Sequence, residues 1–434
     1  MSRAMKDSGI TWIGEIPEGW QCRPIKNCFS VYSGATPKSE VAEYWDGNII
    51  WVTPADFKTQ DKVVSTGKRN LTEAGYASCG TTMVPAGSII FSKRAPIGTV
   101  AIANVELCTN QGCLSCVPLK NADAWFFYYA ISVFTKQFNL YGTGTTFKEI
   151  SYNDFVNFSM PLPDITEQTR IATYLNRRCA EIDRVIAATQ STIEEYKKLK
   201  QSIITEAVTH GVRGPRKMKD SGVEWIGEIP EEWQVSRVGL HYHIILGKML
   251  CSEPPTDEYT LERYICAANV HFDGISDIDK LKEMWFSPVE KRLYQVLNGD
   301  LLVVEGGAGA GGCAIVSGLI GNTFIQNSIM ILRNKVHRDN RYLRYLIEYF
   351  VKQGYIDVVC NKATIPHFTK DKLATVPFPV MTIDEQIEIA DYLDKRYTEI
   401  DRLIDAKQQF LAQLESYKKS VIYEYVTGKR EVPA

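Results

Sequence analysis

The stretch TEQTRIATYLNRRCAEIDRVIAA, residues 166–188, returns 218 residues later as DEQIEIADYLDKRYTEIDRLIDA, residues 384–406. In both copies, steps of four and three residues lead from one apolar position to the next, which is typical of a helix that packs lengthwise on another helix. The sequence therefore predicts two long helices. Capping-type residues precede each of them, and Gly211 and Gly428 provide stop signals.

The predicted helices share an apolar seam with a few polar breaks, which either loosen the packing or face partners: Arg178, Thr189 and Lys407. Two matched seams with charged flanks favour pairing with each other; in the alternative, each helix packs only on its own domain. Since the first helix ends where the second globular part begins, the pairing must be antiparallel. The seam residues are Ile171, Leu175, Ile182, Val185, Tyr196, Leu199 and Ile203 in the first helix, and Ile389, Leu393, Ile400, Leu403, Phe410, Leu414, Tyr417 and Val421 in the second.

A second repeat opens each half of the chain, as MKDSGITWIGEIPEGW at residues 5–20 and MKDSGVEWIGEIPEEW at residues 218–233. Between this opening and the helix, only short segments correspond. They are WVTPADF from Trp51 and YICAANV from Tyr264, PAGSIIF from Pro85 and LNGDLLV from Leu297, and TTFKEIS from Thr145 and ATIPHFT from Ala363. The chain is thus a tandem duplication in which two similar scaffolds carry different surfaces. We expect globular domains at residues 1–162 and 213–379, and helices at 163–212 and 380–430.

Both globular domains are predicted to contain strands and helices. The runs GSIIFS, TVAIAN, DLLVVE and SIMILR are bounded by Gly, Pro and Asn residues, as strands usually are. A helical segment follows each set of strands, AWFFYYAISVFTKQF in the first half and NRYLRYLIEYFVKQ in the second. The predicted fold class is therefore α/β of the mixed α+β kind, duplicated in tandem and separated by the two long antiparallel helices.

Composition limits the class of protein. With 434 residues, 45% of them hydrophobic, the chain can form roughly two to four domains. It contains no apolar run of about 18 residues and no secretory signal, so we expect a soluble cytoplasmic protein. Its eleven cysteines fit reduced thiols in that compartment. At a formal net charge of -2, nucleic-acid binding requires local basic patches or a partner that contacts the phosphates.

The length of the helices relates to the dimensions of DNA. Helices of roughly 40 to 45 residues span about 60 to 65 Å, on the scale of two turns of duplex DNA. Antiparallel pairing of duplicated halves generates a pseudo-twofold axis. Such a chain imitates a dimer, because it can dock two identical partner subunits or lie along duplex DNA with one reading domain at each half-site.

With these features the chain resembles the specificity subunits of type I restriction-modification systems. The resemblance covers essentially the whole chain and rests on WIGEIPEGW and WIGEIPEEW at the start of each half, and on EQTRIATYLNRRCAEID and EQIEIADYLDKRYTEID at the start of each helix. It implies two target recognition domains, each reading one half of a bipartite DNA sequence. It also implies that the helices act as a spacer and dock two methyltransferase subunits, and that restriction (motor-nuclease) subunits join the assembly.

The same resemblance implies that this chain has no catalytic activity, cofactor or metal of its own. S-adenosylmethionine is then expected in the methyltransferase subunits, and ATP and Mg in the restriction subunits. The sequence shows no Asn-Pro-Pro-Tyr methyltransferase signature and no Walker lysine loop, which argues against a solitary DNA-modifying enzyme. The alternative function is a coiled-coil adaptor that bridges two protein partners, but such an adaptor has no reason to vary its loops while keeping its helices.

Two local patterns suggest other chemistry, and both are weak. LLVVEGGAGAGG contains Gly307, Gly309 and Gly312 in GxGxxG order, but CAIVSG follows as a strand where a dinucleotide-binding turn opens a helix. We therefore predict a glycine hairpin loop at a DNA-facing edge. Cys113 and Cys116 form a CxxC pair without the four ligands of a structural zinc site, so we predict buried thiols.

The residues predicted to contact DNA lie in loops. Arg and Lys read guanine or hold phosphates, and Asn and Gln read adenine. For each candidate the alternative is a solvated surface residue, and for Gln111 and Gln326, in matching turns, a scaffold role stays open. The candidates are Lys38, Lys58, Gln60, Lys93, Arg94, Thr145, Thr146 and Lys148 in the first domain, and Lys248, His271, Gly307, Gly309, Asn361, Lys362, Thr364 and His367 in the second.

Overall fold

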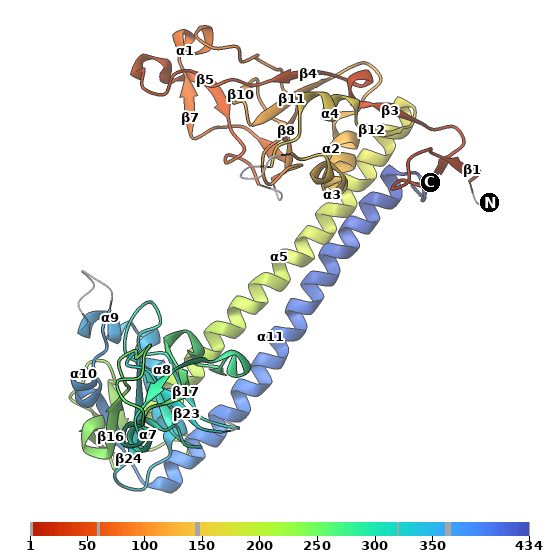
Figure 1. The fold of residues 1–434 in the computed structure, drawn as a ribbon. Helices are drawn as coiled ribbons and strands as arrows, with labels where there is room; N and C mark the ends of the chain where they lie inside the picture. The colour runs from red at the N-terminus through yellow and green to blue at the C-terminus, as the bar shows by residue number, and fades with distance from the viewer. Residues whose placement is uncertain (1–2, 59–60, 144–147, 319–320, 361–365, 434) are drawn as a thin grey trace. The chain divides into compact units, whose positions relative to one another are not determined.

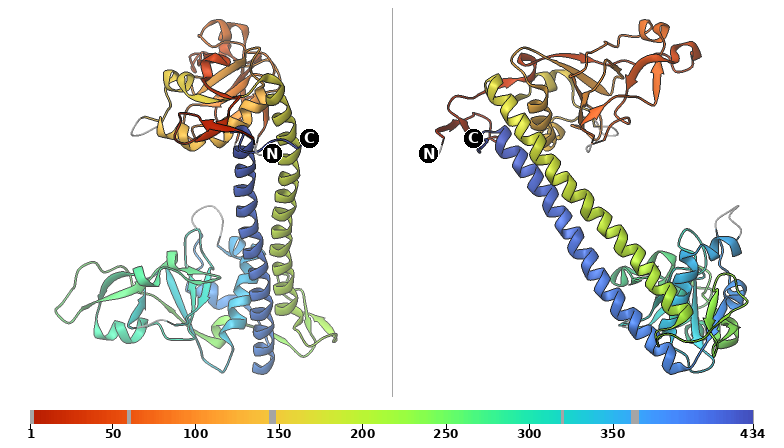
Figure 2. Two further views of the ribbon diagram at one scale, coloured as in Figure 1. Left: turned by 90° about the vertical axis from the view of Figure 1, so that its right-hand side faces the viewer. Right: turned by 180° about the vertical axis from the view of Figure 1, so that it is seen from behind.

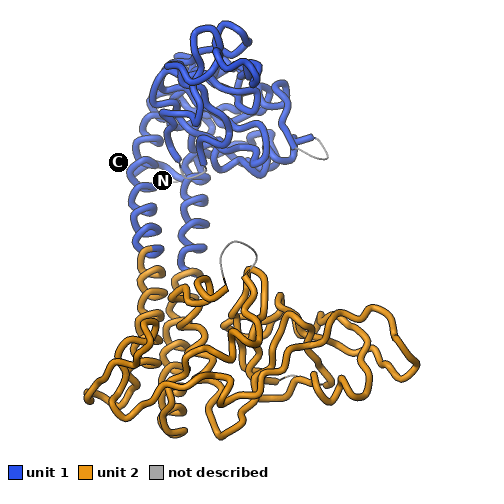
Figure 3. The backbone as a smooth tube through the Cα atoms, turned by 90° about the vertical axis from the view of Figure 1, so that its left-hand side faces the viewer, with its two compact units in different colours: residues 1–190, 409–434 blue, residues 191–408 orange. Residues whose placement is uncertain are grey.

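The computed structural model describes residues 3–58, 61–143, 148–318, 321–360 and 366–433. The chain divides into two compact units (Figure 3): unit 1 contains residues 1–190 and 409–434, and unit 2 contains residues 191–408. The division cuts across both long helices, α5 (Ile165–His210) and α11 (Ile383–Val426). Each unit therefore combines one globular part with a segment of each helix. The pseudo-twofold axis expected from the duplication stays a prediction.

Unit 1 is built on a five-stranded sheet in the order β4-β11-β8-β9-β6, beside a three-stranded sheet in the order β10-β5-β7. The runs GSIIFS and TVAIAN form β8 and β9, whose side chains are all buried. Its strands are β1 (Met5–Asp7), β2 (Glu15–Pro17), β3 (Gln21–Pro24), β4 (Phe29–Ser33), β5 (Trp45–Val52), β6 (Val63–Val64), β7 (Arg69–Leu71), β8 (Ile89–Ser92), β9 (Val100–Ala103), β10 (Cys108–Thr109), β11 (Cys113–Pro118) and β12 (Ser159–Leu162). Its short helices are α1 (Glu73–Ala77), α2 (Ala124–Val133), α3 (Thr135–Leu140) and α4 (Tyr152–Asn157).

Unit 2 repeats this plan with a four-stranded sheet, β16-β24-β21-β22, and a three-stranded sheet, β20-β17-β23. The predicted strands DLLVVE and SIMILR are β21 and β24. Its strands are β13 (Met218–Asp220), β14 (Glu228–Pro230), β15 (Gln234–Arg237), β16 (Tyr242–Leu246), β17 (Thr260–Ile265), β18 (Val270–His271), β19 (Gly274–Ile275), β20 (Lys282–Phe286), β21 (Leu301–Val304), β22 (Cys313–Ile315), β23 (Thr323–Ile325), β24 (Ile329–Asn334) and β25 (Pro377–Val380). Its short helices are α6 (Val238–His241), α7 (Pro288–Tyr294), α8 (Asn340–Lys352), α9 (Tyr355–Val359) and α10 (Lys370–Thr375).

The main core of each unit joins its sheet to the long helices. In unit 1 the core contains Phe91 of β8, Phe127 of α2 and Leu175 of α5. In unit 2 it contains Val303 of β21 and Leu393 of α11. The helices α2 and α8 lie in the predicted helical segments and pack into these cores. The sheets are thus fixed to the helix segments by buried apolar surface, which is the dominant favourable term in folding.

The repeated opening motif fastens the start of one long helix to the end of the other. In unit 1, Trp20 is 1% exposed, and its Nε1 donates a hydrogen bond to Glu167 at the start of α5, at 2.8 Å. The Arg3 guanidinium lies 5.2 Å from the centre of the Trp20 ring and pairs with the same carboxylate at 2.6 Å. Gly428, just after α11, has a φ of +69°, and a Cβ there would lie 3.1 Å from the Trp20 ring. Glycine is therefore favoured by its left-handed backbone and by Pro17, which a Cβ would approach to 2.5 Å.

Unit 2 repeats this anchor. The Trp233 Nε1 donates to Glu385 at the start of α11, at 3.1 Å, and Arg216 pairs with that carboxylate at 2.6 Å. Gly211 ends α5 with a φ of +76°, and a Cβ there would lie 3.1 Å from the Trp233 ring. The predicted stop signals are confirmed at both positions. The opening motif occurs twice because each unit needs one copy to join the start of one long helix to the end of the other.

The glutamine that follows the anchoring glutamate ties each long helix to the globular part. The Gln168 side-chain oxygen accepts the amide of Asp123 at 2.8 Å, and Asp123 caps the start of α2. In unit 2, Gln386 accepts the amide of Asp339, the N-cap of α8, at 3.1 Å. Both glutamines are fully buried. The repeated pair Glu-Gln is thus explained by two tertiary contacts, in addition to its place at a helix start.

Segments of α5 and α11 pair antiparallel within unit 1. The Tyr174 and Tyr425 rings lie 4.6 Å apart, and the Arg178 guanidinium donates to the Tyr417 hydroxyl at 3.2 Å. In these two pairs the residue number rises along α5 while it falls along α11, so the segments are antiparallel. Figure 1 and both views of Figure 2 show these segments side by side.

The helices also pair antiparallel within unit 2. Lys200 pairs with Asp401 at 2.8 Å, and nearer the end of α5 a Cβ at Gly211 would lie 3.2 Å from Glu385. The predicted antiparallel pairing is therefore confirmed in each unit. The alternative, in which each helix packs only on its own domain, is excluded.

The predicted seam is right in its ends and wrong in its middle. Five of the predicted seam residues are 42–46% exposed and do not belong to the seam: Val185, Leu199, Leu403, Phe410 and Tyr417. The positions buried instead include Cys179, Ile193, Tyr397 and Ile404. From Leu175 and Leu393 onward, the seam takes a step of four before a step of three, because Cys179 and Tyr397 are apolar where the predicted positions carry Arg. The seam residues found buried are Ile171, Leu175, Ile182, Ile389, Leu393, Ile400 and Val421; Tyr196, Ile203 and Leu414 are half-buried.

Candidate nucleic-acid interface

Four loops of unit 1 meet beside the five-stranded sheet. The loop after β4 contacts the turn before β11, where the Thr36 hydroxyl hydrogen bonds to the Gln111 side chain. That turn also holds the loop after β8, since the Lys93 amide donates to the Gly112 carbonyl at 3.0 Å. The Lys93 carbonyl accepts the amide of Ile150 at 3.0 Å, which adds the segment before α4. We call this surface edge 1, and it comprises residues 34–38, 93–96, 110–112 and 148–150.

Unit 2 joins the equivalent loops in the same way. The Asn327 amide donates to the Lys248 carbonyl at 2.8 Å, which links the loop after β16 to the turn before β24. The Glu305 amide donates to the Ser328 carbonyl at 2.8 Å, and the Glu305 carbonyl accepts the amide of Phe368 at 2.6 Å. We call this surface edge 2, and it comprises residues 247–250, 305–312, 326–328 and 366–368. One backbone scaffold thus presents two sets of side chains.

Edge 1 is basic. The Lys93 ammonium and the Arg94 Nε lie 2.8 and 2.9 Å from the two carboxylate oxygens of Glu149. Partial burial acts to raise the pKa of Glu149, but hydrogen bonds from Lys93 and Arg94 outweigh it and lower that pKa. Two cations therefore share one carboxylate, which leaves a net positive charge, and Lys148 beside them is exposed. Such a surface attracts phosphate and donates hydrogen bonds to base edges.

Edge 2 has Glu305 and Gly306 in place of the two cations, and His367 in place of Glu149. Gly306 pairs with the exposed His367 in a single β-bridge, and a Cβ on Gly306 would lie 2.9 Å from the His367 Nδ1. Gly307, with a φ of +89°, continues a loop that joins the antiparallel strands β21 and β22. The predicted glycine hairpin is confirmed, and the dinucleotide-binding alternative fails because a strand follows the loop. Edge 2 thus offers backbone groups, one imidazole and the half-buried Glu305 carboxylate to a ligand.

The other predicted DNA contacts lie in several settings. Lys38, Lys58 and His271 are exposed. Lys248 is largely buried and pairs with Glu290 at 2.6 Å, so its ammonium is satisfied inside unit 2. Contact with DNA stays a prediction for all of these residues. Outside the described residues lie Gln60, Thr145, Thr146, Asn361, Lys362 and Thr364.

Sequence reasoning missed Glu149, because a lone acidic residue is not a usual DNA contact. Its signal was present: the alignment of TTFKEIS with ATIPHFT places Glu149 opposite His367, and both residues bridge the loop after a buried strand. For the paired glutamines, scaffold contacts are found. The Gln326 side-chain oxygen accepts the amide of Ser328 at 3.2 Å, and Gln111 bonds Thr36.

The CxxC pair lies in β11 and is buried. Burial raises the pKa of the Cys113 and Cys116 thiols, so both stay protonated at neutral pH. Within the parts of the chain that the structure describes, no group of three or more His, Cys, Asp or Glu residues is placed to hold a metal ion. Among those same residues, no helix combines the length and the apolar character needed to cross a bilayer.

The paired helix segments carry an apolar flank in each unit. Because Arg178 bonds Tyr417, the residues one heptad further along, Val185 on α5 and Phe410 on α11, are neighbours on the same flank. We call Val185, Phe410 and Tyr417 flank 1. In unit 2 the repeat places Leu403 where unit 1 has Val185, Leu199 where it has Tyr417, and Thr192 where it has Phe410. We call Leu199 and Leu403 flank 2. Exposed apolar groups aligned on a helix pair are typical of a docking surface.

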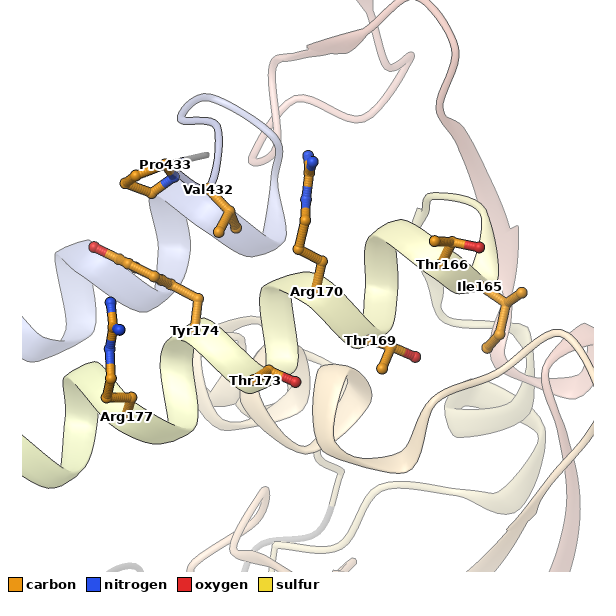
Figure 4. A pocket seen from close by; sticks show the side chains of 9 residues that line it. All are labelled: Ile165, Thr166, Thr169, Arg170, Thr173, Tyr174, Arg177, Val432 and Pro433. Carbon is orange, nitrogen blue, oxygen red and sulfur yellow. The ribbon is translucent and has the colours of Figure 1, made fainter.

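Unit 1 also has a shallow groove of about 700 Å³ at the start of α5. Figure 4 shows Arg170 and Arg177 projecting on the same side as Val432 and Pro433, with Tyr174 between them. In unit 2 the repeat places Glu388 and Asp391 where unit 1 has Arg170 and Thr173. The groove is formed by helix and chain end, so it is separate from edge 1.

Comparison with known proteins places the chain among DNA specificity modules. The model of the family described as "Type I restriction modification DNA specificity domain" matches residues 17–195 and 286–416, which is more than half of the chain. The putative type I restriction enzyme MjaX specificity subunit of Methanocaldococcus jannaschii is 28% identical over 97% of this chain and 96% of its own length. The MjaIX specificity subunit of the same organism is 32% identical, and there the match spans about half of both proteins, 53% of each.

Two solved structures share the fold. A chain from a study of complex assembly and conformational transition of the type I R-M system superposes with a TM-score of 0.75 at 17% identity, over 96% of this chain and 99% of that one. The HsdS subunit from Thermoanaerobacter tengcongensis superposes with a TM-score of 0.54 at 18% identity, over 96% and 98%. At these identities the structural likeness concerns the fold.

Proposed function

The chain belongs to the type I restriction-modification DNA specificity family, and from that premise we propose that it reads a bipartite DNA sequence. Edge 1 of unit 1 recognises one half-site, and edge 2 of unit 2 recognises the other. We also propose that it acts in the cytoplasm.

One observation carries this proposal: edges 1 and 2 have the same backbone links and different side chains. The Lys93 and Glu305 amides and carbonyls make equivalent bonds, yet edge 1 presents two cations and a carboxylate where edge 2 presents Glu305, Gly306 and a histidine. A scaffold that holds its loops in place while their side chains vary is what the reading of two different sequences requires. A surface that only binds the phosphate backbone would not need different side chains on the two edges.

We also propose that each unit docks one copy of a methyltransferase subunit through its apolar flank. Flanks 1 and 2 share two equivalent heptad positions, Val185 with Leu403 and Tyr417 with Leu199, so two copies of one partner can bind equivalent sites. The restriction (motor-nuclease) subunits join that complex. The chain contributes recognition and scaffolding, and bond-making chemistry belongs to its partners. We expect S-adenosylmethionine to bind to the methyltransferase subunits, and ATP and Mg to bind to the restriction subunits.

The proposal is tested by methylation in cells. A host lacking its own DNA methylation receives the genes for this chain and its methyltransferase subunit, and single-molecule sequencing maps the methylated sites. We expect one bipartite sequence with an unspecified gap, and no methylation when either gene is omitted.

Replacing residues 1–162 with the same segment of a relative should change one half-site and leave the other intact. An adaptor that only bridges protein partners predicts that methylation, if any, shows no dependence on this chain's loops. Retention of both half-sites after the exchange would therefore contradict DNA reading by unit 1.

A further inference from the structure

Glu149 holds two cations of edge 1 at once. Its Oε1 lies 2.8 Å from the Lys93 ammonium, and its Oε2 accepts a hydrogen bond from the Arg94 Nε at 2.9 Å. Both carboxylate oxygens are thus occupied within the protein. The trio has a net positive charge, and the carboxylate serves to orient the cations.

The backbone on both sides of this trio is also fixed. Arg94 and Glu149 form a β-bridge, and Glu149 exchanges two backbone hydrogen bonds with Thr143, at 3.0 and 3.1 Å. Ile150 donates to the Lys93 carbonyl and is fully buried. The position of the Arg94 Cα is therefore set by the sheet and by the core beneath it.

The bond to Nε determines what Arg94 offers to a ligand. Because the guanidinium is planar, holding Nε fixes the direction of the fork formed by Nη1 and Nη2. The side chain is 44% exposed, and within the described parts of the chain neither Nη atom has a hydrogen-bond partner. A fixed, solvent-facing pair of donors matches the O6 and N7 acceptors of guanine in the major groove.

Edge 2 indicates that this fork serves base reading. At the positions of Lys93 and Arg94 it has Glu305 and Gly306, and at the position of Glu149 it has His367, although the backbone bonds are the same. Contacts to phosphate position a protein on any DNA sequence, so two copies of one scaffold would both keep them. Contacts to bases change with the sequence that is read.

We propose that Arg94 determines specificity for a guanine in the half-site read by unit 1, and that Glu149 is the positioning residue that holds its fork. The inference rests on the proposed function, since it presupposes that edge 1 faces DNA. It adds the base, the reading residue and the residue that orients it.

The test is a binding selection from random duplex DNA, with this chain assembled with its methyltransferase subunit. The variants are Arg94→Ala, Arg94→Lys, Glu149→Gln and the double variant Arg94→Ala with Glu149→Gln. The matched control is Arg23→Ala, because the exposed Arg23 on β3 also has its Nε held by a side-chain oxygen, that of Gln21 at 2.9 Å, and lies outside edge 1. The unit 2 half-site provides an internal control for folding and assembly.

For Arg94→Ala we expect preference for guanine at one position of the unit 1 half-site to fall about 10- to 100-fold, with all other positions unchanged. Arg94→Lys should lose the same preference, since an ammonium lacks the fork. Glu149→Gln should weaken preference at that same position, and the double variant should be no worse than Arg94→Ala. A role of Glu149 in stability alone would not be confined to one base.

Three outcomes would overturn the inference. One is a wild-type unit 1 half-site without guanine, and another is a half-site unchanged by Arg94→Ala. The third is a uniform loss of affinity on every sequence that Arg94→Lys restores, which identifies a phosphate contact. Failure of the proposed function is distinct: the wild-type complex would then select no bipartite sequence.

Discussion

Glu385 and Glu167 hold equivalent tryptophans, but their side chains differ in exposure, 3% against 14%. We expect Glu385→Gln to lower the free energy of unfolding of unit 2 by about 3 kcal/mol, because the largely buried Arg216 then keeps only the exposed Glu232 as a charged partner. Glu167→Gln should cost less, since Arg3 is more exposed than Arg216. Urea unfolding followed by tryptophan fluorescence measures both variants, and equal losses would contradict this ranking.

Gly428 and Gly214 share a left-handed backbone but differ in their surroundings. At Gly214 a Cβ meets nothing within 4 Å, so Gly214→Ala should cost only the backbone strain, about 1–2 kcal/mol. Gly428→Ala should cost more, because its Cβ would lie 2.5 Å from Pro17 and 3.1 Å from the Trp20 ring. The two midpoints of thermal unfolding make the comparison, and a smaller loss for Gly428→Ala would show that this contact yields freely.

For individual residues, the sequence showed which positions are repeated in the two halves, but it did not show which residues their side chains contact. The repeated Glu-Gln pair was visible as a helix start, but Gln168 bonds the amide of Asp123, 45 residues earlier in the chain. Such a contact depends on how a sheet and a helix pack, which no local pattern encodes. Glu149 was missed for the same reason: its meaning comes from two cations more than 50 residues away in the chain.

In the long helices, the residues that form the buried seam follow a different heptad phase from the predicted one. Ile193 is 5% exposed and Leu199 is 43% exposed, although the predicted seam contained Leu199 and omitted Ile193. We expect Ile193→Ala to lower the free energy of unfolding by about 2–5 kcal/mol and Leu199→Ala to change it by less than about 1 kcal/mol. Denaturant unfolding of the two variants checks the phase, and a larger loss for Leu199→Ala would restore the predicted seam.

Helices and strands were predicted correctly where one regular pattern of apolar residues runs through the whole segment. The apolar runs of β8, β9, β21 and β24 and the helical segments before each long helix were all found. The heptad period of the long helices was right, but the order of its steps was wrong. After Leu175 a step of three reaches Arg178 and a step of four reaches Cys179. Which of the two is buried depends on how the partner helix packs.

At the scale of the whole molecule, flanks 1 and 2 predict how many partner subunits bind. Phe410→Asp in flank 1 and Leu403→Asp in flank 2 should each remove one methyltransferase copy, because a charge replaces an exposed apolar contact. The control is Gln408→Asp, which adds the same charge at an exposed position on the polar flank. Native mass spectrometry should give two copies for the wild type and the control, one for each variant and none for the double variant. Two copies bound to the double variant would show that the flanks are not the docking surface.

The helices also predict the length of the unspecified gap. Inserting one heptad after Thr189 and another after Lys407 keeps the seam in phase and adds about 10.5 Å to the helix pair. We expect the gap to widen by roughly three base pairs while both half-sites keep their bases. Affinity should fall as well, because three base pairs turn one half-site by about 100° around the duplex. Selection from random DNA measures both, and altered half-site bases with an unchanged gap would contradict a spacer role.

Unit 1 is assembled from residues 1–190 and 409–434, so segments that lie far apart in the chain must remain compatible with each other. A recombination that brings in a new first half replaces Trp20 and Tyr174 but leaves behind Gly428 and Tyr425, which pack against them. Descendants of such a crossover keep a folded unit only where the incoming segment preserves those two rings. Edges 1 and 2 are then free to diverge, and under the proposed function each exchange between alleles yields a new combination of half-sites in a single generation.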